Sequence, residues 1–246
     1  MAHSIAVVCE ARADQQTSCD LADRVFTAEV EWFDEDLLGD CRRWQGFRAS
    51  DPFLTWTEAK RLAKSHRIKA HGQFDGKPGT DDAVATRRVL MLLRMSEHAP
   101  EVVVLLRDDD GRDRRHGMRQ ARRESSIGVP VVIGVARFMR ECWVLAGFQP
   151  QNDRETKRLD KLRNELGFDP IRAAERLTAN RPHKKLSSKR VLAQLTEDNW
   201  DRQAVCWRDT DLAVLEDNGR NTGLPEYLDE IREKIVAEFW PGPASS

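Results

Sequence analysis

Residues 102–111 read Val-Val-Val-Leu-Leu-Arg-Asp-Asp-Asp-Gly. The run of five apolar residues that opens this stretch predicts a strand buried on both faces, because a half-exposed strand would alternate apolar and polar residues. Two other runs have the same character, Ile5-Ala6-Val7-Val8-Cys9 and Val131-Val132-Ile133-Gly134-Val135. Such strands are typical of a parallel sheet that is covered by helices on both sides.

A helical pattern stands directly before the strand at residue 102. Residues 82–95 place Ala85, Val89 and Leu92 on one face, and Pro100 then leads into the strand. A helix followed by a strand at this spacing is typical of βαβ units. The chain is therefore expected to be α/β, with a mostly parallel sheet flanked by helices.

Two shorter segments before residue 82 carry local signals. Residues 56–66 predict a short helix with Thr57 as its cap. The segment from His71 to Thr80 is predicted to be a loop, because three glycines and a proline interrupt any regular element there.

After Gly147 the sequence becomes polar and mostly helical in pattern. We predict an α/β domain over residues 1–148, a helical C-terminal appendage packed on it over 149–240, and a frayed tail over 241–246. The expected helices of the appendage are one that ends at the C-cap Gly167, one that starts at Asp169-Pro170, one over 186–195, and an amphipathic one over 224–239.

The composition limits the classes of function. The 246 residues include 40 Lys and Arg against 41 Asp and Glu, and the net charge of −1 gives no global attraction to nucleic acid or to an acidic membrane. Five cysteines without a CxxC pair favour the reducing cytoplasm. No apolar run approaches the roughly 20 residues that cross a bilayer, and no targeting segment is recognised.

Acidic residues follow the ends of the predicted strands. Glu10 follows the first, Asp108 and Asp110 follow the second, and Glu141 comes shortly after the third. Ligands of parallel α/β sheets bind at the carboxyl ends of strands, and a carboxylate cluster there suits a hard divalent cation. We predict that Glu10, Asp108 and Asp110 bind Mg²⁺ or Mn²⁺ and, with Glu141, catalyse phosphoryl displacement.

Each acid also has a purely structural interpretation. Glu10 can be a polar loop residue, and the triplet at 108–110 can form a helix-capping turn. Glu141 can be a solvated helix residue.

Basic residues follow the acidic triplet directly. Arg112, Arg114 and Arg115 are candidate contacts to a nucleic-acid backbone, and Lys77 and His71 from the glycine-rich loop join them. The alternative is a solvated helix face. The loop lacks the spacing GxxxxGK[ST], so it is not expected to be a nucleotide-binding loop.

The strand-end motifs resemble those of the Toprim family, which includes topoisomerases, primases and nucleases of the overcoming-lysogenization-defect type. The two motifs are Ile5-Ala-Val-Val-Cys-Glu10-Ala11 and Val103-Val-Leu-Leu-Arg-Asp108-Asp-Asp110-Gly111. Residues 131–147 and 206–224 are similar to a bacterial Toprim-like subfamily whose members are often encoded beside ABC- or SMC-type ATPases in apparent phage-defence cassettes. The chain departs from many Toprim proteins at Ala11, where they have glycine.

The resemblance implies a Mg²⁺-dependent nuclease that cuts DNA or RNA as an effector of antiviral defence, with an ATPase partner. Glu10 would be the general acid/base or a metal ligand, Asp108 and Asp110 would bind Mg²⁺, and Glu141 would be an accessory acid. Two alternatives stay open: a catalytically idle adaptor that docks on an ATPase, and a phosphatase or phosphotransferase of another strand-end-aspartate fold. The single tyrosine, Tyr227, lies in the last predicted helix, which disfavours a tyrosine nucleophile.

Overall fold

The computed structural model describes residues 2–33 and 35–241 of the chain. The chain divides into two compact units that interleave along the sequence. The first comprises Met1–Arg107, Arg112–Gly134 and Asp229–Ser246, and the second comprises Asp108–Gly111 and Val135–Leu228. The division into 1–148 and 149–240 stays a prediction, and residues 242–246 of the predicted tail lie outside the described residues.

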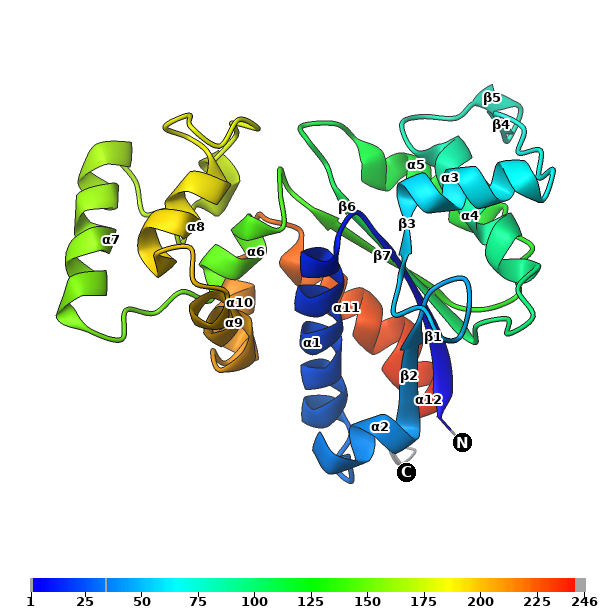
Figure 1. Ribbon diagram of the computed structural model, residues 1–246, viewed down its shortest axis with the longest axis horizontal. Helices are drawn as coiled ribbons and strands as arrows, with labels where there is room; N and C mark the ends of the chain where they lie inside the picture. Colours follow the sequence, from blue (N-terminus) through cyan, green and yellow to red (C-terminus); the bar gives the residue numbers. More distant parts are fainter. Residues whose placement is uncertain (1, 34, 242–246) are drawn as a thin grey trace. The chain divides into compact units, whose positions relative to one another are not determined.

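A mostly parallel sheet forms the centre of the first unit (Figure 1), as the sequence predicts. Within the described part of the chain it has five strands in the order β2-β1-β6-β7, and β3 also pairs with β1. β1 is parallel to β2, β3 and β6. The strands are β1 His3–Cys9, β2 Arg42–Gln45, β3 Leu54–Thr55, β6 Val102–Asp108 and β7 Val131–Ala136.

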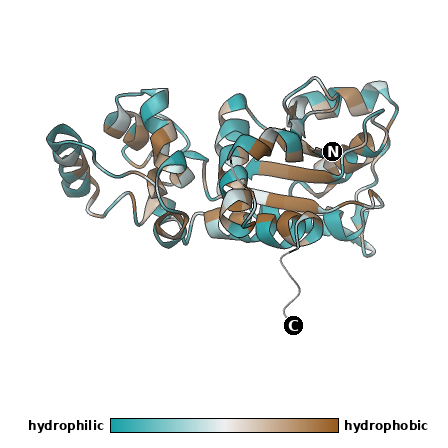
Figure 2. Ribbon diagram, turned by 90° about the horizontal axis from the view of Figure 1, so that it is seen from below, coloured by the Kyte–Doolittle hydropathy of each residue, from teal (hydrophilic) through white to brown (hydrophobic). Residues whose placement is uncertain are grey.

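Helices cover both faces of this sheet. Figure 2 shows the hydrophobic strands, in brown, between layers of helix. α4 packs against both α3 and α5, and α1 packs with the C-terminal helical segment. The helical elements of the first unit include α1 Arg12–Glu29, α2 Leu38–Cys41, α3 Trp56–Ser65, α4 Ala83–Arg94, α5 Arg114–Arg123, the end of α11 Leu224–Ile231, a π-helical turn Arg232–Val236 and α12 Ala237–Phe239.

The order of the strands creates a topological switch point between β1 and β6. From β1 the chain winds through α1 to β2 on one edge, and later through α4 to β6 on the other edge. The parallel register joins Ile5 to Val102 and Val8 to Leu105, so the two strands end side by side at their carboxyl ends. Right-handed connections in opposite directions place their helices on opposite faces of the sheet.

The predicted loop at 71–80 is wrong, because it contains an antiparallel hairpin. β4 Gln73–Phe74 pairs with β5 Lys77–Pro78. Asp75 and Gly76 form the turn with φ of 49° and 74°. Two successive left-handed residues are the signature of the type I′ hairpin turn, for which Asp-Gly is a preferred pair.

The predicted helix at 56–66 is confirmed as α3, but its cap was misplaced. The side chain of Thr55, not that of Thr57, accepts a hydrogen bond from the backbone N–H of Glu58. α4 likewise confirms the helix predicted for 82–95, with Val89 and Leu92 buried.

The second unit is helical, and Trp143, Trp207 and Tyr227 are large buried side chains within it. Trp143 and Tyr227 stack with 5.2 Å between ring centroids, and Trp143 Nε1 donates to the carbonyl of Thr222 over 2.8 Å. The elements are α6 Glu141–Ala146, α7 Asp153–Leu166, a 3-10 turn Ala174–Arg176, α8 Ser188–Thr196, α9 Trp200–Arg208, α10 Leu212–Asn218 and most of α11.

Two predictions for this unit had different outcomes. Gly167 is the C-cap of α7 with φ of 78°, as predicted. The helix predicted to start at Asp169-Pro170 is wrong, because that segment forms turns. The side chain of Asp169 accepts from the N–H of Ile171 and from Arg163, so it stabilises a local turn instead.

No helix among the described residues is long and apolar enough to span a bilayer.

Candidate functional site

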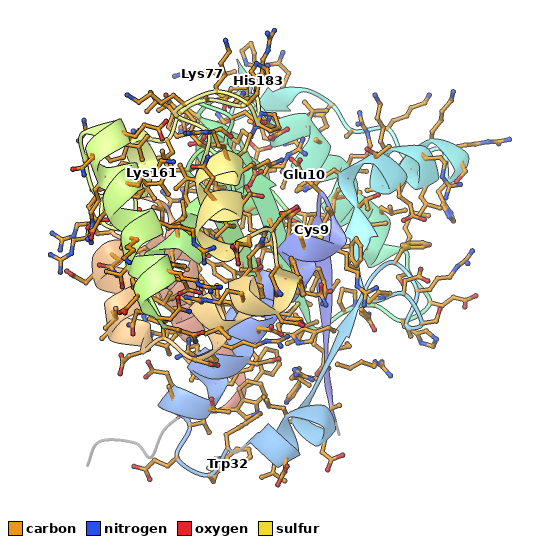
Figure 3. All side chains as sticks on the ribbon, turned by 60° about the vertical axis from the view of Figure 1, so that its left-hand side comes forward. Cys9, Glu10, Trp32, Lys77, Lys161 and His183 are labelled. Atoms are coloured by element: carbon orange, nitrogen blue, oxygen red, sulfur yellow. The ribbon has the colours of Figure 1, made fainter. Side chains whose placement is uncertain are left out.

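Glu10 lies at the junction between β1 and α1. It directly follows Cys9 at the end of the strand (Figure 3), and the next residue, Ala11, is the N-cap of α1. Its side chain is 41% exposed, and its carboxylate accepts a hydrogen bond from Arg107 over 2.8 Å. The charge of the predicted catalytic acid is therefore balanced by a strand residue of β6.

Arg107 connects several elements at the switch point. Its guanidinium also donates to Asp82, over 3.2 and 3.3 Å, and lies 4.8 Å from the centre of the Trp56 ring. Arg114 donates to the same carboxylate over 2.8 Å. Glu10, Arg107, Asp82 and Arg114 thus form a continuous chain of alternating charges, here called the switch-point network.

Asp82 is a member of this network that the sequence reasoning missed. It stands at the N-cap position of α4 with φ of 64°, yet its side chain makes no capping hydrogen bond. Burial raises the pKa of its carboxyl group, but the hydrogen bonds from Arg107 and Arg114 outweigh burial and hold that pKa below its ordinary value. Asp82 is thus ionised at neutral pH and fixes both arginines.

The acidic triplet belongs to the second unit, where it orders a turn. Asp108 accepts a hydrogen bond from the N–H of Arg140 over 2.8 Å. Asp109 accepts from the N–H groups of Gly111 and Phe138, each over 2.8 Å. Asp110 and Gly111 have φ of 50° and 77°, so the chain turns sharply there. The carboxylates of Asp108 and Asp109 therefore stabilise the local turn through backbone hydrogen bonds.

Glu141 is the first residue of α6 and is mostly buried. Its side chain is 13% exposed, and Oε1 lies 3.4 Å from Nη2 of Arg140. Oε2 is buried without a hydrogen-bond partner among the residues that the structure describes. The interpretation of Glu141 as a solvated helix residue is therefore wrong.

The predicted nucleic-acid contacts all lie in the first unit but have different surroundings. Lys77 is exposed on β5 and projects outward (Figure 3), and Arg112 is exposed just before α5. Arg114 is only 11% exposed at its side chain because it faces Asp82, and Arg115 is partly buried.

His71 is positioned by a buried arginine. Its Nδ1 lies 2.8 Å from Nη1 of Arg87, which also donates to the carbonyl of His71 over 2.7 Å. Arg87 also forms an ion pair with Glu124, so this arginine anchors the segment that leads into the β4–β5 hairpin.

The acids do not form a preassembled divalent-metal centre. In residues 2–33 and 35–241, no three His, Cys, Asp or Glu side chains are grouped so that they could hold a metal ion. The carboxylate of Glu10 pairs with the guanidinium of Arg107, and the carboxylate of Asp108 accepts the backbone N–H of Arg140. Burial raises the pKa of the Cys9 thiol and raises that of the Cys142 thiol to about 12, so both thiols are protonated at neutral pH.

No protein-family model, curated protein or solved structure matches this chain, so the resemblance to Toprim proteins rests on the motifs alone.

Proposed function

We propose that the chain cuts phosphodiester bonds of DNA or RNA at the carboxyl ends of β1 and β6, with Mg²⁺ or Mn²⁺ as cofactor. The observation that supports this is the switch point between these strands. In open α/β sheets, ligands bind outside the carboxyl ends of strands at such a point. Glu10 follows β1 there, and Asp108 is the last residue of β6.

In this proposal the residues of the chain bind the substrate and move a proton. Arg107 is a charge-assisted donor that matches phosphate oxygens, and it already holds the carboxylate of Glu10. Glu10 serves as the general acid/base. Asp108 and Asp110 would bind the divalent cation, and Glu141 would be an accessory acid.

The test is a cleavage assay on DNA, tRNA and other RNA in Mg²⁺ or Mn²⁺ with the variants Glu10→Gln and Asp108→Asn. Loss of a proton-transfer group typically slows a reaction by about 10²–10⁴-fold, and we expect a loss in that range. Asparagine at 108 keeps an oxygen that accepts the N–H of Arg140, so the turn is maintained. Glu97→Gln, at an exposed position, is the matched control and should cut normally.

Undiminished cleavage by both variants would refute the assignment. Metal dependence is measured separately through the melting temperature with and without Mg²⁺ or Mn²⁺, because an ion that binds the folded state stabilises it by mass action.

A second candidate is an adaptor that docks on an ABC- or SMC-type ATPase in antiviral defence. It is favoured by the structural roles of the acids, since Glu10 pairs with Arg107 and Asp108 accepts a backbone N–H. This candidate predicts no cleavage and no metal stabilisation, together with binding of a neighbouring ATPase that is equally strong in Glu10→Gln and the parent. Cleavage that appears only with the ATPase and requires Glu10 would favour the nuclease.

A further inference from the structure

A pocket of about 270 Å³ lies in the first unit, between α3, α4 and the end of β6. α3 contributes Trp56, Thr57 and Lys60, and Lys60 shares a helix face with the other two because it follows them by four and three residues. α4 contributes Arg88 to its lining, and β6 contributes Arg107.

The lining of this pocket is basic. Lys60, Arg88 and Arg107 contribute three positive charges, and no lining residue is acidic. Arg107 is balanced by Glu10 and Asp82. By contrast, neither Lys60 nor Arg88 makes a hydrogen bond or an ion pair with any of the residues that the structure describes. Two uncompensated cations that converge on one pocket repel each other, and an anion between them relieves that repulsion.

The pocket suits one group of a larger anion. Pockets that enclose a whole small molecule measure roughly 300–1,000 Å³, and this one is smaller. Trp56 is only 8% exposed and Arg107 covers its ring, so the tryptophan offers little surface for a stacked base. The remaining polar groups are ammonium, guanidinium and hydroxyl donors, which match phosphate oxygens.

We propose that Lys60, Arg88 and Arg107 bind a backbone phosphate of a nucleic-acid strand in this pocket. The proposal rests on the proposed function, for which it supplies the substrate anchor. Arg107 lines the pocket and also contacts Glu10, so a strand held here runs beside the carboxyl end of β1.

The experiment measures binding of a fluorescein-labelled 20-nucleotide single strand by anisotropy, in EDTA, over a series of KCl concentrations. The double variant Lys60→Gln/Arg88→Gln is compared with Lys157→Gln/Lys161→Gln, which removes the same charge from exposed positions of α7. We expect the pocket variant to bind at least tenfold more weakly, with a salt slope that is smaller by about one. The control variant should bind like the parent.

Equal binding by the pocket variant, or equal loss in the control, would overturn the proposal. Inorganic phosphate and AMP are tested in parallel by thermal shift. Stabilisation by either that needs Lys60 and Arg88, without any effect of these residues on strand binding, would assign the pocket to a small phosphate and also overturn it. EDTA prevents metal-dependent cleavage during the binding measurement, so binding and cleavage are tested separately. A chain that binds the strand in EDTA but cuts no substrate in Mg²⁺ or Mn²⁺ would support the pocket and refute the nuclease.

Discussion

Asp82 stands at the N-cap of α4, but its carboxylate pairs with two arginines of other elements and does not cap the helix. An aspartate at the start of a helix ordinarily accepts from a backbone N–H of the first turn. Here the carboxylate instead binds Arg107 of β6 and Arg114 of α5, and its side chain is 12% exposed. Arg107 thereby gains a fixed position beside Glu10.

Replacing Asp82 by asparagine should lower the free energy of unfolding at pH 7 by about 1.5–3 kcal/mol, the range for hydrogen bonds to charged groups. Because the pKa of Asp82 is lowered in the folded state, its contribution is complete above the unfolded pKa of about 3.9. It is lost as the pH falls through the folded pKa.

Urea unfolding at pH 7 and pH 3, followed by circular dichroism, measures this difference. The gap between Asp82→Asn and the parent should shrink at pH 3. The neighbouring exposed Asp81→Asn is the control and should be neutral at both values. Equal effects of the two substitutions would contradict the assigned role of Asp82.

At the scale of the element, α3 depends on a cap that precedes its first residue. Thr55 ends β3 and caps α3, so a single residue joins a strand that pairs with β1 to a helix that lines the basic pocket. Thr57, two residues later, is exposed.

Thr55→Ala should therefore lower the free energy of unfolding by about 1 kcal/mol, because it removes the acceptor for the N–H of Glu58. Thr57→Ala should change it by less than about 0.5 kcal/mol, as at other exposed positions. Chemical denaturation of the two variants measures both values, and a larger effect at Thr57 would show that the cap lies there.

At the scale of the whole molecule, the two ends of the described chain meet in the first unit. The ring of Trp240 lies 4.9 Å from those of Phe26 and Phe33, and His3 of β1 lies 4.4 Å from Phe239. The last helical segment thus completes the core around α1, although more than two hundred residues separate them in sequence.

Trp240→Ala should lower the free energy of unfolding by about 3–5 kcal/mol, as for other buried aromatic truncations. Trp32 is the matched control, because it is 58% exposed and its truncation leaves no cavity in a core. Thermal unfolding of both variants provides the measurement. Comparable melting temperatures for the two would mean that the C-terminal segment does not stabilise the first unit.

Two elements that sequence reasoning missed, β2 and α1, lack a clear apolar pattern. β2 reads Arg-Arg-Trp-Gln and has no apolar pattern. The structure can hold this strand because Arg42 forms an ion pair with Asp23 on α1. α1 buries Thr17, Ser18 and Cys19, small residues that look polar in a sequence although they fill a tight helix face. The hairpin turn at Asp75-Gly76 was readable in principle, since that pair is a known turn signal.

The sequence by itself determined the α/β class, the three long buried strands and the acids that follow them, because hydrophobic periodicity and strand ends are local properties of the chain. Only the tertiary structure decided which charges meet. Arg107 contacts Glu10 and Asp82 across long stretches of sequence, and Lys60 and Arg88 converge from two helices. These partnerships depend on strand order and helix packing, and no local pattern of residues encodes the distance between side chains that approach from separate elements.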